Sequence, residues 1–264
     1  MTLTATTNPD PALPEELAWE HRNGSVLGRA ALVIEAFRGT TTGLSLNELI
    51  LRTRLAKSTV YRIAESLVEL GWLERDVRGY AIGIRLFEFG ELAQRPSRIR
   101  ESAQPYLHRL SAATGCAAHL GVLDGGEVLY LGKVSPPNLS VPTRIGARMP
   151  ARSTALGKIM LAFSDGDQAG DTPDEQVRAA TPVQLRDDLA HARLEQIAFD
   201  HEESYPGIVC AAAAVRGSGR AVAAISVTGR ALGFDFPKAA RLARSAAQAT
   251  WTALFLPRSV KSAG

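Results

Sequence analysis

The sequence has little of several features that would define a specialised class of protein. It contains only two cysteines in 264 residues, Cys116 and Cys210. Their wide separation provides neither a disulfide framework nor a paired metal-ligand motif, and it fits a reducing cytosol. No apolar run reaches the length of a membrane-spanning helix. The formal net charge is only +3, so any nucleic-acid surface must be a local patch rather than a property of the whole chain.

The N-terminus also lacks a basic start followed by an apolar stretch, so the sequence predicts no signal peptide. Threonine, proline and aspartate instead predict a disordered tail over residues 1–22. The remaining length is enough for two domains that each bury a core.

Residues 23–82 have the pattern of three helices followed by a hairpin. Apolar residues at helical spacing begin after Ser25, and Ser45 with Glu48 forms a capping box for a second helix. A third helix, roughly residues 56–70, ends at Gly71, and an alternating hairpin follows. The inner stripe of the third helix is Val60, Ile63, Ala64 and Leu67. This order predicts a winged helix-turn-helix.

The front of the third helix carries the side chains that a major groove requires. Four basic residues and no acidic ones lie between Arg52 and Arg62, and polar side chains fill the first turns of the helix, where they can meet base edges and phosphates. Arginines in the hairpin can follow the DNA backbone. The nine expected DNA contacts are Arg52, Arg54, Lys57, Ser58, Thr59, Tyr61, Arg62, Arg75 and Arg78. The alternative for one helix alone is a solvated amphipathic face.

Beyond the hairpin the pattern predicts a linker helix over residues 83–97, ended by Pro96, and an α+β domain over residues 98–260. Two pairs of apolar strands surround glycine-rich turns and are separated by helices, which predicts an antiparallel sheet. One of the separating helices follows Ser153 or Thr154, and another spans residues 181–199.

Three stretches give the chain a resemblance to a known family. The segment "LSLNELILRTRLAKSTVYRIAESLVELGWLERD" resembles the DNA-binding domain of the IclR family of bacterial transcription regulators, and "RSTALGKIMLA" and "DHEESYPGIVCAAAAV" continue that family's pattern. The resemblance covers about Ser25 to Phe255. In the helix-turn-helix connection, Arg54 and Ala56 stand where the family usually has glycine and proline, so Arg54 is expected in a conformation easier for glycine.

The resemblance implies a GAF-like domain that binds a small-molecule effector, and regulators of this kind bind a roughly palindromic operator as homodimers that often pair into tetramers. It places the effector site at Ala155, Leu156, Asp200, Ile208, Cys210, Ser226 and Thr228. Family members include repressors and activators, with effectors from small oxo-acids to aromatic acids. It implies no catalytic residue, cofactor or metal, and a cytoplasmic, nucleoid-associated protein.

The residues themselves support several interpretations of this site. Amides in the first turn of the helix after Ser153 favour a carboxylate, and Ser226 and Thr228 alternate on one strand, so they face the same side. Both hydroxyls could instead bond to backbone inside a core. Cys210 could be plain packing, and Asp200 could cap a helix or turn.

Phosphate binding, metal binding and catalysis have weaker support in the sequence than the binding of an effector. "TALGKIM" resembles a phosphate-binding loop, but Arg152 replaces its first glycine and Ile159 replaces its serine or threonine. Cys116 with His119, or His201 with Glu202 and Glu203, could bind a metal, yet neither has recognised ligand spacing. The alternative function is a ligand-hydrolysing or metal-dependent enzyme with an accessory DNA-binding domain. A hydrolase would use Cys210, Asp200 and a histidine, although no nucleophile elbow supports it.

Overall fold

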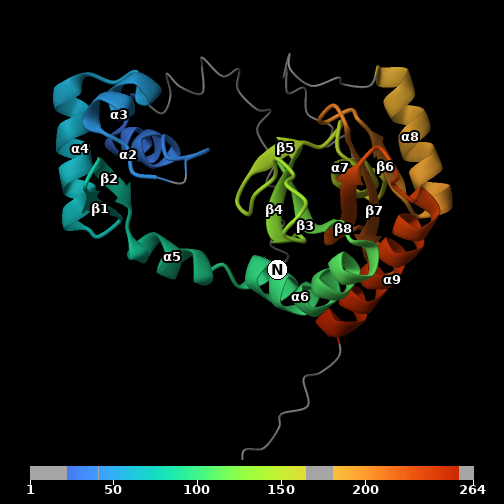
Figure 1. The fold of residues 1–264 in the computed structure, drawn as a ribbon. Coiled ribbons are helices and arrows are strands. Elements are labelled where there is room, and N and C mark those ends of the chain that lie inside the picture. Colours follow the sequence, from blue (N-terminus) through green and yellow to red (C-terminus); the bar gives the residue numbers. More distant parts are fainter. Residues whose placement is uncertain (1–22, 41, 165–180, 256–264) are drawn as a thin grey trace, which may run out of the picture. The chain divides into compact units, whose positions relative to one another are not determined.

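A computed structural model describes residues 23–40, 42–164 and 181–255 of the chain. The chain divides into two compact units, Met1–Ala93 and Gln94–Gly264, which are coloured along the sequence in Figure 1. The expected tail at residues 1–22 lies outside the described residues. Among the helices that are described, none has the length and apolar character that a membrane crossing needs.

The first unit contains three helices, a two-stranded hairpin and a further helix. These are α2 (Val26–Glu35), α3 (Leu46–Thr53), α4 (Lys57–Glu69), β1 (Leu73–Asp76), β2 (Gly79–Ile82) and α5 (Ile84–Glu91). The predicted capping box is present at the start of α3, where the amide of Ser45 donates to Glu48 Oε2 at 2.8 Å and its hydroxyl accepts from the Glu48 amide. The predicted order of three helices and a hairpin is confirmed.

α4 packs its inner stripe into the small core of this unit. Val60, Ala64 and Leu67 are buried, whereas Ile63 is half-buried. The helix stops at Gly71, whose φ of 71° lies in the left-handed region that favours glycine. The backbone of Tyr80 in β2 pairs with Leu44 as well as with β1, so a single β-bridge anchors the hairpin beside the helices.

The predicted end of the linker helix is wrong. α5 ends at Glu91, and a second helix, α6 (Gln94–Thr114), begins before Pro96. Proline is tolerated there because the amides of a first helical turn have no partner within the helix. The boundary between the two units therefore falls after Ala93, a few residues before the position expected from the sequence.

The second unit is one antiparallel sheet with helices on both faces. Its further elements are β3 (Ala117–Asp124), β4 (Glu127–Val134), β5 (Arg148–Pro150), α7 (Ala155–Ala162), α8 (Pro182–Glu195), β6 (Ala198–His201), β7 (Ile208–Val215), β8 (Ala223–Arg230) and α9 (Phe236–Phe255). The strands lie in the order β5-β4-β3-β8-β7-β6, and each neighbouring pair is antiparallel. Both predicted strand pairs, β3–β4 and β7–β8, are confirmed.

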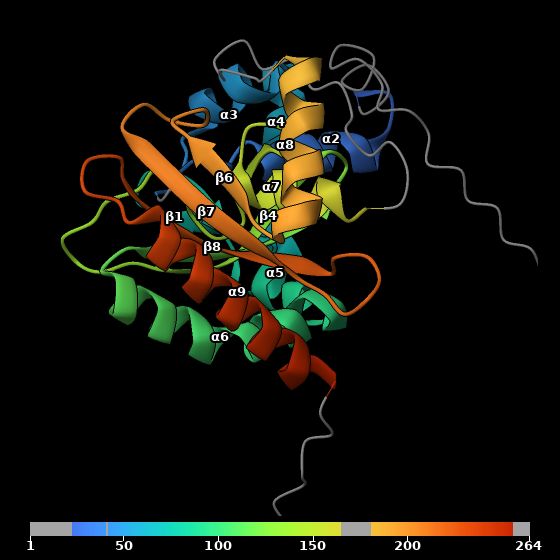
Figure 2. The ribbon, with the colours of Figure 1, turned by 90° about the vertical axis from the view of Figure 1, so that its right-hand side faces the viewer.

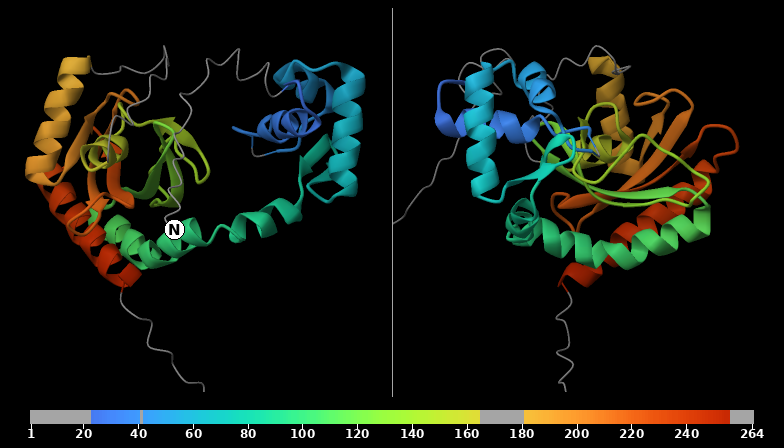
Figure 3. Two further views of the ribbon diagram at one scale, coloured as in Figure 1. Left: turned by 180° about the vertical axis from the view of Figure 1, so that it is seen from behind. Right: turned by 60° about the vertical axis from the view of Figure 1, so that its left-hand side comes forward.

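Alternate residues of the strands face two separate cores. One core lies between the sheet and the pair α6 and α9, which pack side by side across one face (Figures 1 and 3). The other core lies between the opposite face and α7, with α8 packed outside α7 (Figure 2). All eight residues of α7 are buried, so its apolar sequence reflects a helix enclosed on every side.

The predicted helix over residues 181–199 is too long. α8 ends at Glu195 because Gln196 adopts the left-handed conformation, with a φ of 56°. The next residues alternate between the two cores, since Ile197 packs with α6 and α9 whereas Ala198 packs with α7. This period of two is that of a strand, and β6 becomes the edge strand that carries Asp200.

Candidate functional site

The N-terminal half of α4 presents a polar face to solvent. Lys57, Ser58, Tyr61 and Arg62 are exposed and Thr59 is half-buried, opposite the buried stripe of the helix. The methyl group of Ala56, the N-cap residue, cannot cap the helix. The first-turn amides and the positive end of the helix dipole therefore remain suited to a phosphate.

The two arginines that precede α4 have different surroundings. Arg54 is exposed at the end of α3 and has a φ of 54° and a ψ of 21°, so the expectation of a conformation easier for glycine is confirmed. Arg52 donates from Nη1 to the carbonyls of Ala36, at 2.8 Å, and Arg38, at 3.3 Å. Its guanidinium thus satisfies carbonyls at the end of α2 in addition to any contact with DNA.

The two arginines of the hairpin differ in the same way. Arg78 is exposed in the turn between β1 and β2. Arg75 donates to Glu65 of α4, with 2.6 Å between Nη2 and Oε1, and its guanidinium lies over the ring of Tyr80. Arg52 and Arg75 thus bond within the unit, whereas the other seven expected DNA contacts are exposed or, for Thr59, half-buried: Arg54, Lys57, Ser58, Thr59, Tyr61, Arg62 and Arg78.

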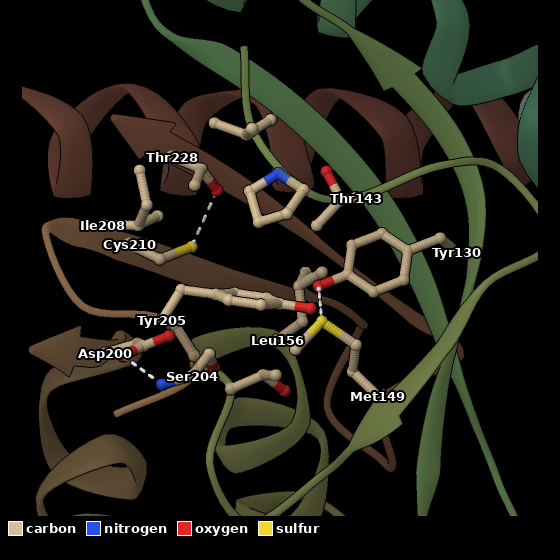
Figure 4. Close-up of a pocket in the computed structure, with 14 residues that line it drawn as sticks. Tyr130, Thr143, Met149, Leu156, Asp200, Ser204, Tyr205, Ile208, Cys210 and Thr228 are labelled. Atoms are coloured by element: carbon tan, nitrogen blue, oxygen red, sulfur yellow. Dashed lines mark hydrogen bonds between the residues drawn. The ribbon is translucent and has the colours of Figure 1, made fainter. Parts of the chain in front are cut away.

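In the second unit a cavity lies between the sheet and the start of α7. Six of the seven expected effector residues line it, and they come from α7, β6, β7 and β8 (Figure 4). These six are Ala155, Leu156, Asp200, Ile208, Cys210 and Thr228. Residues from four separate segments therefore meet at one place.

Ser226 is the expected residue that the structure does not bring to the cavity wall. It is wholly buried in β8, between His119 of β3 and Ala212 of β7, and is not among the lining residues. It does share a strand face with Thr228, but two residues along a strand correspond to about 6.6 Å. That displacement leaves Ser226 within the core while Thr228 reaches the cavity.

The start of α7 offers backbone amides to the cavity. Thr154 caps the helix by accepting from the Gly157 amide at 3.0 Å, and the first intrahelical bond runs from the Lys158 amide to the Thr154 carbonyl. The amides of Ala155 and Leu156 precede that bond. A Cβ atom at Gly157 would clash with the backbone of Ala151, so glycine lets the preceding chain pack directly on the helix.

Asp200 is a buried carboxylate that caps a turn, which is one of the two roles that the sequence allows for it. Its Oδ1 accepts from the amide of Glu203 at 2.8 Å and from that of Ser204 at 3.4 Å. Burial raises the pKa of this carboxyl, and the nearby Glu203 raises it further, against the effect of those hydrogen bonds. The residue therefore both shapes the loop after β6 and lines the cavity.

Several residues of the cavity were missed by sequence reasoning. Tyr130 of β4, Thr143 and Met149 line one side, and Ser204 and Tyr205 come from the loop after β6. Tyr130 donates to the Met149 sulfur at 3.7 Å. In Figure 4 the side chain of Tyr205 crosses the middle of the cavity. The sequence of β4 has no regular alternation of polar and apolar residues, so it gave no indication of Tyr130.

The cavity is small in this conformation. It has about 20 Å3 of room for the centres of water molecules, which is of the order that one ordered water requires. No arginine or lysine is among the described residues that line it. A ligand larger than this requires side chains of the wall to move apart.

The geometry gives no support to nucleophilic catalysis at Cys210. Burial raises the pKa of this thiol to about 12, whereas a reactive cysteine needs a thiolate. Within the described residues, no three histidine, cysteine, aspartate or glutamate side chains come together as a possible metal site.

A winged helix-turn-helix and a sheet domain with a small cavity lined by apolar and hydroxyl side chains define a class: DNA-binding transcription regulators with a ligand-binding domain. Residues 26–77 match the IclR helix-turn-helix domain, and residues 93–251 match the bacterial transcriptional regulator IclR C-terminal domain. The chain belongs to the IclR family, and it is a transcriptional regulator whose DNA binding is modulated by a small-molecule effector.

Individual relatives agree with this assignment. The chain is 29% identical over 211 residues to the HTH-type transcriptional regulator XynR of Escherichia coli, which covers 76% of this chain and 84% of that protein. It is 31% identical to the regulator BhcR of Paracoccus denitrificans, over 78% of this chain and 77% of that protein. A crystal structure of an IclR homolog from Microbacterium hydrocarbonoxydans complexed with 4-hydroxybenzoate shares 26% identity, with a TM-score of 0.79, and covers 87% of this chain and 99% of that one.

Proposed function

We propose that the first unit binds a roughly palindromic operator as a homodimer and that the cavity of the second unit binds a small organic acid, which is released unchanged. The observation that carries the proposal is the cavity at the start of α7, with two helix amides on one side and hydroxyl groups on the others. Helix amides stabilise an anion without a buried cation, which would be costly when the site is empty.

An aromatic or hydroxylated monocarboxylate fits this chemistry best. The wall combines apolar side chains, such as Leu156 and Ile208, with the hydroxyl groups of Tyr130 and Thr228. Asp200 would repel a carboxylate, so we place the ligand's acid group near α7 and away from Asp200. The related structure that contains 4-hydroxybenzoate supports the same class of ligand.

The homodimer is supported by an apolar stripe on α5. Ile84, Phe87 and the cap residue Leu92 are 67%, 63% and 74% exposed, and their spacing places them on one side of the helix. A second copy of this chain would cover such a stripe. The family resemblance also supports pairing of dimers into tetramers, and action on DNA supports a location in the bacterial cytoplasm with the nucleoid.

The test begins by selecting the operator from genomic DNA fragments with the full chain. Fluorescence anisotropy then measures operator affinity with and without 4-hydroxybenzoate, and chromatography of the ligand afterwards tests for turnover. Arg62→Ala should lose operator affinity and keep acid binding, whereas Thr228→Val should keep operator affinity and lose the response to acid. Loss of the acid during incubation would contradict a regulator that only binds it. A monomer bound to DNA would contradict the dimer.

A further inference from the structure

His119 lies behind the wall of the cavity without lining it. It stands in the middle of β3, opposite Lys133 of β4 and Ser226 of β8, and is 1% exposed. A polar ring in the centre of an apolar sheet needs partners for both nitrogens. The two partners that it has are side chains of the cavity wall.

Both ring nitrogens of His119 contact threonine hydroxyls that line the cavity. Nδ1 is 3.2 Å from Thr228 Oγ1 and Nε2 is 2.7 Å from Thr143 Oγ1. In the view of Figure 4, Thr228 and Thr143 lie on one side of Tyr205, with Leu156 and Ser204 on the other. The ring thus joins two points of the same wall.

The ring of His119 is neutral. Burial lowers its pKa to about 3, and the ammonium group of Lys133 lowers it further. A neutral imidazole has one N–H donor and one nitrogen that accepts. One threonine must therefore give its hydrogen to the ring, while the other accepts the ring's hydrogen and keeps its own.

The tautomer of the ring decides which threonine has which role. With the proton on Nδ1, Thr143 donates to Nε2 across the 2.7 Å contact. Thr143 then faces the cavity with lone pairs only. Thr228 accepts from Nδ1 and retains a hydrogen, which it can offer to a ligand or to the weakly accepting sulfur of Cys210 at 3.1 Å.

The loop that carries Thr143 is held in place independently of the ring. The ammonium group of Lys133 donates to the carbonyls of Val141 and Thr143. Thr143 is thereby fixed through its backbone and its side chain to neighbouring positions on β3 and β4, and its hydroxyl cannot reorient freely to suit a ligand.

We propose that His119 is a positioning residue that gives the cavity one hydroxyl donor, Thr228, and one hydroxyl acceptor, Thr143, and thereby selects acids that carry a hydroxyl group. This rests on the proposed binding of an organic acid. The two ring nitrogens point away from each other, so the two threonines meet separate groups of the ligand. A ligand hydroxyl donates to Thr143 and another oxygen of the ligand accepts from Thr228, whereas a second carboxylate would face the lone pairs of Thr143. The other tautomer would exchange the two roles and keep the same pairing.

The binding test compares three matched acids by calorimetry with the full chain: 4-hydroxybenzoate, benzoate and benzene-1,4-dicarboxylate. The wild-type protein should bind the hydroxy acid at least about tenfold more tightly than the other two, because each leaves one polar group of the wall unpaired. Thr143→Val and His119→Leu should bring the ratio of hydroxy acid to benzoate close to one. His119→Gln, which keeps a donor and an acceptor, should retain part of the preference.

Ser226→Ala is the matched control, since Ser226 is buried on the same face of β8 but does not line the cavity. It should leave the ratio at its wild-type value. An unchanged ratio in Thr143→Val, or equal wild-type affinity for the hydroxy acid and the dicarboxylate, would overturn the proposal.

A second measurement tests the hydrogen-bonding role of His119 without any ligand. Nitrogen-15 NMR of the histidine rings should show one protonated and one bare nitrogen for His119 from pH 5 to pH 8. Thr143→Val should change the shift of Nε2, and Thr228→Val that of Nδ1. Two protonated nitrogens, or averaging between tautomers, would contradict the proposal. If no acid binds the wild-type protein, the proposed effector class is wrong and these shifts alone decide the role of His119.

Discussion

Arg75 of the hairpin and Glu65 of α4 form an ion pair, with 2.6 Å between Nη2 and Oε1. The hydroxyl of Tyr80 donates to the same carboxylate oxygen at 2.8 Å, and this hydrogen bond and Arg75 hold the pKa of Glu65 below its usual value. The recognition helix and the wing are therefore joined by a polar contact, and the charge of Arg75 is balanced within the protein.

Because the charge of Arg75 is balanced by Glu65, we expect Arg75 to contribute little to the salt dependence of operator binding. Removing both charges in Glu65→Gln with Arg75→Gln should leave the salt dependence of operator binding unchanged. Arg62→Ala, which removes an exposed and unbalanced charge of α4, should reduce the slope of log K against log salt by about 0.9 for each phosphate that the variant no longer neutralises. Anisotropy titrations at several salt concentrations measure both slopes. An equal reduction in the double variant would show that Arg75 leaves Glu65 to bind phosphate.

Arg54 should limit the stability of the first unit. A non-glycine residue in the left-handed region costs about 1–2 kcal/mol, and Arg54 has that conformation. Because glycine also loses more conformational freedom on folding, we expect Arg54→Gly to raise the free energy of unfolding of this unit by roughly 1 kcal/mol. Urea denaturation provides the measurement.

Arg54→Ala separates conformation from charge. It removes the guanidinium but keeps the Cβ atom, so it should give no such gain in stability. Both variants should weaken operator binding to the same extent if Arg54 contacts phosphate. If Arg54→Ala raised the free energy of unfolding as much as Arg54→Gly, charge repulsion by Arg54, and not its backbone conformation, would limit the stability of the first unit.

Much of the fold follows from local patterns in the sequence. The capping box at Ser45, the stop at Gly71 and the turn at Gly125 and Gly126 each depend on residues within a few positions of one another. These patterns predict α3, α4 and the β3–β4 hairpin without tertiary information. The six cavity residues that were correctly placed together came from the family resemblance, which carries tertiary information that one sequence does not.

Features that depend on distant contacts could not be predicted. β5 and β6 are edge strands of three and four residues, too short for a periodic pattern to define. His119 and Thr228 are 109 residues apart in the chain, and a single histidine in an apolar strand gives no indication of its partner. Ser226 and Thr228 have the same pattern in sequence, and only the packing around β8 distinguishes them.

His119 should make the stability of the second unit depend on pH. The pKa of this ring is ordinarily 6.5 and is about 3 in the folded protein. Below pH 6.5 the unfolded chain therefore binds a proton at His119 that the folded chain does not bind. The stabilisation is complete above pH 6.5 and is lost as the pH falls toward 3. The advantage of the wild type over His119→Gln should shrink by roughly 2 kcal/mol between pH 7.5 and pH 5. Urea denaturation at both pH values tests this, and a constant difference would mean that folding does not change the pKa of the ring.

Lys158 of α7 fixes the loop that carries Tyr205. Its side chain is 2% exposed, and its ammonium group lies 2.6 Å from Glu203 Oε1 and 2.9 Å from Asp188 Oδ2. Glu203 is in the loop after β6, between Asp200 and the Tyr205 side chain that crosses the cavity (Figure 4). The ion pair therefore connects a buried helix to the segment that carries Tyr205.

Replacing this lysine should both destabilise the second unit and loosen the loop. Lys158→Met leaves Glu203, whose side chain is 19% exposed, without its cation, and loss of one partner from a buried pair costs roughly 3 kcal/mol. Asp188 also loses this cation, but its side chain is 44% exposed, so water solvates its carboxylate. Hydrogen exchange of the amides of Ser204 and Tyr205 should become faster, and ligand association should become faster with it. Adding Glu203→Gln to Lys158→Met should restore part of the stability, because it removes the uncompensated charge.

Arg148→Met is the matched control, since Arg148 pairs with Asp124 at the end of β3 and Glu127 at the start of β4, whose side chains are 60% and 33% exposed. Exposed pairs contribute about 1 kcal/mol or less, so this variant should change stability little and leave exchange in the 202–207 loop unaltered. If Lys158→Met exchanges at the wild-type rate in this loop, the ion pair does not restrain Tyr205. Movement of Tyr205 would then depend on its packing in the cavity alone.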